Sequence, residues 1–363
     1  MRMCYKEDWD QAARRMEAWW AGEVIDRACI AVTASRGKPG AALQPPKDDF
    51  ARWADPDYLI AACEAGFANT YFGGEAFPTR TLLIGYAALG NPATYVERTI
   101  WTEPVIERWS NAGEAAGQTS VPCPPKLTRW HFDPQNDGWQ ATKRVTETLV
   151  EAGAGKWMVS TATVPTPTDA LSSLRGPERL CVDLVEHREH VVAMRDYLAD
   201  VWFRCYDELH RIIQRQMRGS TSWLPVWSPG RTYTLQCDFS CMISPRMFRE
   251  FVIPELEAQT RWLTHTIYHL DGPGAVQHLD ALLELPRLNA IQWVPGAGAP
   301  PPLKWLPLLK RIQQAGKGLH ISIAKEDVEA ALAELSPKGL FIATSCKTIA
   351  EADALLRMAA RPT

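Results

Sequence analysis

Residues 266–294 decide the fold class, because they contain two short apolar segments joined by one helical segment. The stretch reads TIYHL at 266–270, GAVQHLDALL at 274–283 and AIQWV at 290–294. Short apolar strands separated by a helix are typical of a parallel sheet in which helices make the crossover connections. The stretch therefore predicts one strand–helix–strand unit.

The same alternation continues to the end of the chain and back to about residue 141. Further strands are expected at 28–32, 157–161, 223–227, 233–237, 319–323 and 340–344. Further helices are expected at 8–20, 58–70, 142–152, 181–184, 188–218, 245–262, 304–315, 325–335 and 349–358. About eight strands fit a single (β/α)8 TIM barrel, an α/β fold, better than two Rossmann halves. The sequence has neither GxGxxG after the first strand nor GxxxxGK[ST].

The first 140 residues are less regular than the rest of the chain. Gly- and Pro-rich segments interrupt them, and we expect only short strands there, such as one over 95–100. A length of 363 residues suggests two domains at about 150 residues each, although barrels often exceed this size. We therefore predict an elaborated region at 1–140 packed on the main part of a barrel at 141–363, in one structural domain overall.

Composition excludes several classes of protein. The chain is 46% hydrophobic and 22% charged with a net charge of −3, which is typical of a soluble globular protein and gives no electrostatic case for nucleic-acid or membrane partners. The first twenty residues are charged throughout and contain no apolar segment of the kind found in signal peptides. We expect a cytoplasmic protein whose nine cysteines are reduced.

The active site of a barrel lies at the carboxyl ends of its strands, so polar residues that follow strands are the candidates. His269 and Asp271 are two residues apart at one strand end and should emerge on the same side. With Cys346 from another strand, and Cys237 as a fourth ligand, they offer zinc an imidazole, a carboxylate and thiolates. The alternative is a turn histidine, a capping aspartate and buried thiols. Asp238, which follows the strand at 233–237, is a catalytic candidate, as is Asp271.

Other residues near strand ends are candidates for binding a small substrate or for acid–base chemistry. Trp227 and Trp293 would form an aromatic wall, Arg175 would hold an anionic group, and Glu75 would act as an acid, a base or a ligand. The alternatives are core packing for the tryptophans, an ion pair for Arg175 and an ordinary turn carboxylate for Glu75. Tyr268 and Trp101 complete the predicted substrate-binding set.

One segment resembles a known family. Residues 238–254, DFSCMISPRMFREFVIP, resemble the uroporphyrinogen decarboxylase superfamily, in which an acidic residue, a Ser-Pro helix start, a Phe-x-x-Phe pair and a Pro recur after a middle barrel strand. YHLDG at 268–272 resembles the H-x-C-G strand end of the corrinoid:thiol methyltransferase branch, and Cys346 lies where that branch has its last zinc cysteine. The resemblance covers about residues 140–360.

The methyltransferase branch implies a (β/α)8 barrel with a zinc ion held by one histidine and two cysteines. The zinc activates a thiol that accepts a methyl group, usually from methylcobalamin on a corrinoid partner protein. The resemblance implies that His269 and Cys346 of this chain keep their roles as ligands. Asp271 replaces the middle cysteine, and its carboxylate oxygen is a harder ligand, in the acid–base sense, than a thiolate. The decarboxylase branch implies a metal-free site, but its arginine-rich segment R-Q-A-G-R-Y is absent here.

Three functions follow from these patterns. The first is a zinc-dependent methyl or alkyl transferase acting on a small substrate, with a corrinoid protein as donor. The second is a metal-free decarboxylase or lyase of the same superfamily, and the third is a ligand-binding barrel without turnover. The loop at 296–302 and the amino-terminal region are candidate surfaces for a corrinoid partner or a second copy of the chain.

Overall fold

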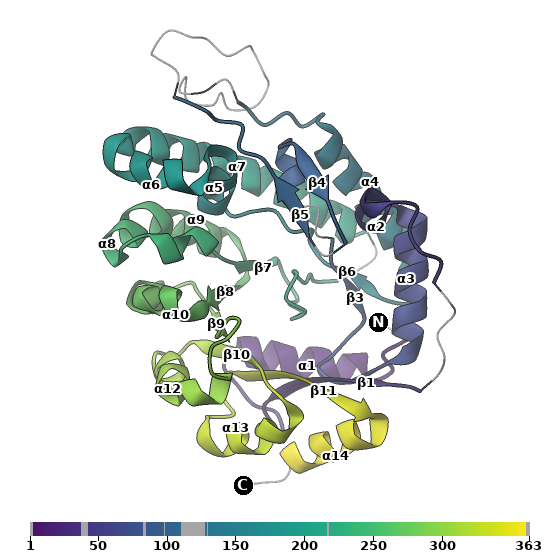
Figure 1. Ribbon diagram of the computed structural model, residues 1–363. Coiled ribbons are helices and arrows are strands. Elements are labelled where there is room, and N and C mark those ends of the chain that lie inside the picture. Colours follow the sequence, from purple (N-terminus) through teal and green to yellow (C-terminus); the bar gives the residue numbers. More distant parts are fainter. Residues whose placement is uncertain are drawn as a thin grey trace.

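The protein is an α/β structure built around one mostly parallel sheet. The computed structural model describes residues 3–37, 43–82, 85–97, 99–109, 128, 130–215 and 218–360. The central sheet has seven strands in the order β2-β1-β11-β10-β9-β8-β7, and only the edge strand β2 runs antiparallel to its neighbour (Figure 1). The strands are β1 (Cys29–Ser35), β2 (Thr70–Gly74), β7 (Thr232–Leu235), β8 (His265–Asp271), β9 (Ala290–Val294), β10 (Gly318–Ser322) and β11 (Leu340–Thr348).

Two short ladders lie outside the central sheet. Strands β3 (Thr79–Arg80) and β6 (Met158–Val159) pair in parallel, and β4 (Ala93–Tyr95) pairs antiparallel with β5 (Ile100–Thr102). The strand predicted over 95–100 is wrong as one continuous strand, because Tyr95 is the last residue of β4 and Ile100 is the first residue of β5. The predicted strand at 223–227 is also wrong, since this segment does not pair with any strand of the described residues. The α/β class is confirmed, and the closed eight-stranded barrel stays a prediction.

Helices follow most of the parallel strands, as the sequence pattern predicts. They are α1 (Trp9–Trp20), α2 (Asp49–Ala54), α3 (Pro56–Asn69), α4 (Asp137–Ala152), α5 (Pro167–Arg175), α6 (Pro177–Glu186), α7 (Arg188–Ile213), α8 (Pro245–Met247), α9 (Ile253–Trp262), α10 (Gly272–Ala275), α11 (Leu279–Leu283), α12 (Leu306–Gln314), α13 (Val328–Glu334) and α14 (Ile349–Ala359). Shorter helical turns are η1 (Gly85–Leu89), η2 (Asp238–Met242), η3 (Phe248–Val252), η4 (Val276–His278), η5 (Pro302–Trp305) and η6 (Lys325–Asp327).

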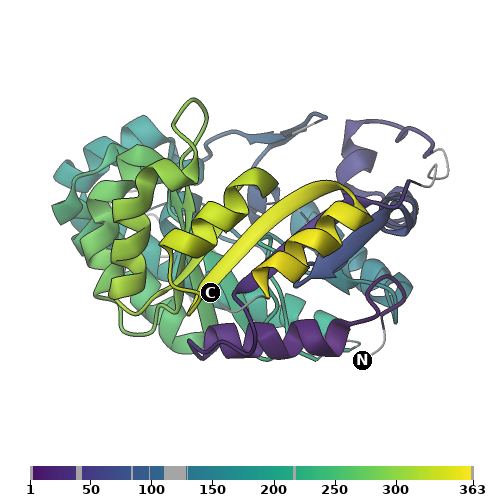
Figure 2. The ribbon, with the colours of Figure 1, turned by 90° about the horizontal axis from the view of Figure 1, so that it is seen from below.

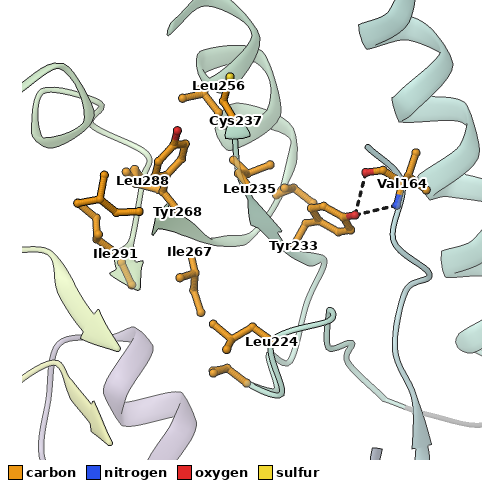
Figure 3. Close-up of a cluster of buried hydrophobic side chains, with 14 of the residues drawn as sticks. Val164, Leu224, Tyr233, Leu235, Cys237, Leu256, Ile267, Tyr268, Leu288 and Ile291 are labelled. Carbon is orange, nitrogen blue, oxygen red and sulfur yellow. Dashed lines mark hydrogen bonds between the residues drawn. The ribbon is translucent and has the colours of Figure 1, made fainter. Parts of the chain in front are cut away.

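The outer face of the sheet, which we define as the face covered by helices, is apolar and buried. On β7, Tyr233 contacts Trp202 of α7 edge to face, with ring centroids 5.3 Å apart. Successive side chains of a strand alternate between faces, and Figure 3 shows Ile267 and Tyr268 of β8 pointing in opposite directions. Tyr268 lies in the cluster between the sheet and the helices. The other face, which we call the inner face, is therefore the one available for a site.

Helix α1 covers the amino-terminal ends of the parallel strands. Trp19 donates from Nε1 to the carbonyl of Gly339, just before β11, at 2.7 Å. Trp20 stacks on His265, the first residue of β8, with centroids 4.6 Å apart. Figure 2 shows α1, in purple, along the edge opposite the green loop that follows β9. The carboxyl ends of the strands are therefore on the side that α1 leaves uncovered.

The amino-terminal region contributes directly to the central sheet, because β1 lies between β2 and β11. The division at about residue 140 stays a prediction, and β1 shows that the earlier part packs into the same body. In the part of the chain that the structure describes, no helix combines the length and apolar character that crossing a membrane requires.

Candidate active site

The register of the sheet assigns the predicted residues to its two faces. His269 is level with Gln292 of β9, and Gln292 is level with His320 of β10, so these three side chains share the inner face. Tyr268 and Trp293 are their chain neighbours and lie on the outer face. The inner face at the carboxyl half of β8 and β9 is therefore polar, although most of the surrounding sheet is apolar.

His269 is held at the centre of this polar region. Its Nδ1 lies 2.6 Å from Oε1 of Gln292. An amide oxygen can only accept, so in the neutral form of the ring Nδ1 carries the proton and Nε2 has the free lone pair. The indole of Trp223 meets the imidazole edge to face at 5.0 Å between centroids. The side chain is only 15% exposed, so the ring is fixed and Nε2 is the atom positioned to accept a proton.

Two carboxylates flank His269 on the same side. Asp271 Oδ2, on a half-exposed side chain, lies 4.0 Å from His269 Nε2, which is too long for a hydrogen bond and at the outer limit of an ion pair. Asp238, at the exit of β7, accepts from Nε2 of Gln236 at 3.2 Å. Desolvation raises the pKa of Asp238, the charge of His269 opposes this rise, and the negative charge of Asp271 adds to it. The pKa of Asp238 therefore responds to the charges of both His269 and Asp271 at the ends of β7 and β8.

A buried aspartate fastens the segment that carries Asp238. The backbone amides of Asp238 and Phe239 donate to Oδ2 and Oδ1 of Asp169 at 3.0 and 3.1 Å. Asp169 belongs to the first turn of α5 and is itself buried. Burial and the charge of Asp238 raise the pKa of Asp169. The carboxylate of Asp169 thus fixes the position of Asp238 from behind the site.

A second buried carboxyl group lies next to Asp169. Glu255 of α9 accepts from the backbone amide and the hydroxyl of Thr168 at 2.9 and 2.7 Å, both through Oε2. Its Oε1 is buried and has no hydrogen-bond partner. Desolvation raises the pKa of Glu255 to about 8. The group is therefore mainly protonated at neutral pH.

His320 is the remaining histidine of the inner face near the site. It is buried and stacks on Phe341 with ring centroids 5.1 Å apart. Desolvation, followed by the charge of His269, lowers the pKa of His320 to about 3. It stays neutral in the working pH range, so among the inner-face histidines beside the carboxylates His269 is the one suited to proton transfer.

The predicted zinc ligands do not come together. Cys346 is level with Ala34 of β1 on the outer face, in a small cluster with Val32 and Ala352 of α14. Cys237 is 4% exposed and lies in the apolar layer beside Leu256 (Figure 3). Among the described residues, no three His, Cys, Asp or Glu side chains are grouped so that they could hold a metal ion. The thiolate–imidazole set implied by the methyltransferase branch therefore does not fit this chain.

Three of the predicted aromatic contacts are also wrong as substrate contacts. Trp293 is fully buried on the outer face and meets Trp305 at 5.1 Å between centroids. Tyr268 is 2% exposed on the same outer face. Trp227 contacts Trp9 of α1 at 5.4 Å and so lies at the amino-terminal side of the sheet. All three side chains are buried in the apolar core, which for the two tryptophans is the alternative that the sequence left open.

Arg175 and Glu75 take structural roles. Arg175 donates from Nε to Asp183 at 2.6 Å and from Nη1 to the carbonyl of Ile106 at 3.1 Å. Glu75 is fully buried and accepts from two nitrogens of Arg27, at 2.7 and 3.0 Å, and from the backbone amide of Ile30 at 2.6 Å. Both side chains are occupied, so neither is presented to a substrate. Trp101 on β5 is 67% exposed, and its role in binding stays a prediction.

Gln292, Trp223 and Asp169 were not predicted as site residues. Gln292 follows from the alternation along β9 only once the register with β8 is known. Trp223 lies in a segment expected to be a strand, which hides its position over His269. Asp169 is an acidic residue in the first turn of a helix. Such residues are common at the start of any helix, so the sequence alone does not mark Asp169 as part of a site.

Comparison with known proteins identifies the fold of the chain but not its family. The sequence matches no protein-family model and no curated protein. The structure is similar to that of a methyltransferase from Methanosarcina mazei, with a TM-score of 0.61 and 13% sequence identity over 96% of this chain and 98% of that chain. The chain therefore shares the overall fold of that enzyme, and the resemblance to the uroporphyrinogen decarboxylase superfamily stays a prediction.

Proposed function

We propose that the protein is a group-transfer enzyme that moves a methyl or alkyl group onto a small acceptor, with His269 as general base. The observation that carries the proposal is the convergence of His269, Asp238 and Asp271 at the carboxyl ends of β7 and β8. Ligands of α/β sheets bind at the carboxyl ends of the strands, and a carboxyl group whose pKa is shifted by burial and by neighbouring charges, as that of Asp238 is, is typical of an active site.

The arrangement is suited to deprotonating an acceptor. The free lone pair of His269 Nε2 takes the proton from the hydroxyl, thiol or amine of the acceptor. The heteroatom of the acceptor then attacks the carbon of the donor, the bond between that carbon and the rest of the donor breaks, and its electron pair leaves with the donor. The positive imidazolium that results is stabilised by Asp271 at 4.0 Å and by Asp238. Gln292 keeps the ring oriented throughout, because Nδ1 remains its hydrogen-bond donor.

That the transferred group is a methyl group is part of the proposal, and it is supported by the fold shared with the Methanosarcina mazei enzyme.

Closure of the sheet into a barrel is also part of the proposal. One backbone hydrogen bond supports closure: the amide of Thr161, just beyond β6, donates to the carbonyl of Thr221. A corrinoid partner as methyl donor also stays a proposal. Zinc is not part of it, since the predicted ligands face opposite sides of the sheet.

Product analysis tests the proposed reaction. The purified protein is incubated with methylcobalamin and a panel of small thiols, phenols and amines, and methylated products are identified by mass spectrometry. The proposal predicts enzyme-dependent methylation of at least one acceptor class. A complete absence of methylated product, with S-adenosylmethionine as donor as well, would contradict methyl transfer.

A metal-free decarboxylase or lyase is the second candidate, and the raised pKa of Asp238 favours it. A carboxyl group whose pKa is raised by desolvation is suited to protonating a carbanion formed by loss of carbon dioxide. Incubation with a panel of small carboxylic acids and measurement of released carbon dioxide separates the two candidates. Release of carbon dioxide without any methylated product supports the lyase and contradicts the transferase.

A further inference from the structure

A cavity of about 300 Å³ lies between α2, α3, β3 and the turn that joins β4 to β5. Arg52 of α2 and Arg80 of β3 contribute two positive charges, and Glu97 of the turn contributes one negative charge. The rings of Trp53 and Tyr58 form part of its wall. Trp53 is fixed there, because its Nε1 donates to the carbonyl of Val96 at 2.9 Å.

Arg52 and Arg80 are half-buried, and they differ from the buried arginines in the described part of the chain. The buried arginines are each paired with a carboxylate: Arg15 with Asp26, Arg27 with Glu75, Arg175 with Asp183 and Arg195 with Asp196. Neither Arg52 nor Arg80 has an ion pair within the described residues, and Nε of each is buried without a hydrogen-bond partner. Buried donors without acceptors cost free energy, so their retention beside a cavity indicates that something else supplies the acceptors.

We propose that this cavity binds the oxyanion group of a small molecule, a carboxylate or a phosphate. Guanidinium groups match the oxygen atoms of such anions through paired hydrogen bonds, and two of them outweigh the single charge of Glu97. The cavity volume is at the lower end of the range for small-molecule sites. The aromatic rings of Trp53 and Tyr58 suit an apolar portion attached to the anion. The proposal stands apart from the reaction assigned to His269.

Calorimetric titration tests the proposal with two probes, inorganic phosphate and succinate, at constant ionic strength. Saturable binding of either probe to the wild type is expected. Arg80→Gln and Arg52→Gln should each weaken binding at least tenfold, because each removes one charge and one set of donors. Glu97→Gln should strengthen binding, since it removes the opposing charge. Preference for phosphate or for succinate identifies the source of the oxyanion.

Arg357→Gln is the matched control, because it removes an arginine from an exposed position of α14. It should bind the probes as the wild type does. Arg80→Lys keeps the charge and loses the planar donor pair, so it should bind more weakly even if Arg80→Gln fails to fold. Failure of both probes to bind the wild type, or equal binding by wild type, Arg80→Gln and Arg80→Lys, would overturn the proposal.

Discussion

His269 and Cys346 point to opposite faces of the same parallel sheet. Across the sheet, His269 is paired in register with Gln292, Gln292 with His320, and His320 with Phe341 of β11. Cys346 is five residues beyond Phe341 on the same strand. An odd separation along a strand places the two side chains on different faces. The sulfur consequently packs towards α14, and the imidazole lies on the inner face.

Zinc binding should therefore be independent of this pair of residues. We expect Cys346→Ala and His269→Gln to hold the same amount of zinc as the wild type after equilibration with the metal and gel filtration. Elemental analysis of the three proteins provides the measurement. One equivalent of zinc in the wild type that is lost in both variants would show that the two side chains share an ion and would contradict the register.

Asp169 should stabilise the protein by fastening the segment that carries Asp238. Asp169→Asn replaces one acceptor oxygen with an amide nitrogen, so one of the two backbone amides loses its partner. We expect a loss of about 1–3 kcal/mol in the free energy of unfolding, measured with urea. Asp133→Asn is the control, because Asp133 also accepts from a backbone amide, that of Gln135, but at an exposed position. Equal effects of the two substitutions would argue against a buried anchor.

Glu255 should make the protein less stable as the pH rises. Its folded pKa of about 8 lies above the unfolded value of about 4.3, so the folded state binds more protons between these two values. The contribution of Glu255 to the free energy of unfolding is then greatest below about pH 4.3. It falls as the pH rises towards 8, by at most about 1.4 kcal/mol for each pH unit. Glu255→Gln removes this titration and keeps an acceptor for Thr168.

The measurement is the free energy of unfolding of wild type and Glu255→Gln at several pH values from 5 to 9. We expect the difference to shift in favour of the variant as the pH rises to about 8 and then to level off. A difference that does not change with pH, or that shifts in favour of the wild type, would show that Glu255 is ionised in the folded protein.

Glu75 should matter for folding rather than for chemistry. Glu75→Gln leaves Arg27 and Arg15 buried beside a neutral group, and breaking a buried ion pair in this way costs about 3–5 kcal/mol. Glu284→Gln breaks the exposed pair with Arg249 and should change stability little. Urea unfolding of both variants provides the test. A Glu75→Gln protein that is fully stable but inactive would instead place Glu75 in the reaction.

Much of the fold could be predicted because local patterns and tertiary packing agree over residues 230–360. The strand at 290–294 has the predicted bounds, and the helix at 349–358 is one residue short at its end. The predicted strand at 223–227 failed because an apolar, Trp-rich segment has the same composition as a strand, whereas here its two tryptophans contact His269 and α1.

The site could be predicted only in part. The spacing of His269 and Asp271 fixes their common face, since it is set within one strand. The face of Cys346 depends on the register between strands distant in the sequence, and a shift of one residue reverses it. The partners of Glu75 and Arg175 depend equally on tertiary contacts, so a buried ion pair and a catalytic carboxylate cannot be told apart from the sequence.

The activity of two single variants shows whether His269, without Cys346, is the general base. Once an acceptor is known, kcat/KM is measured for wild type, His269→Gln and Cys346→Ala after dialysis against a chelator. We expect kcat/KM to fall about 10²–10⁴-fold for His269→Gln, the usual contribution of a general base, and to stay near the wild-type value for Cys346→Ala. Full activity of His269→Gln, or a comparable loss in Cys346→Ala, would show that His269 is not the general base or that Cys346 takes part in the reaction.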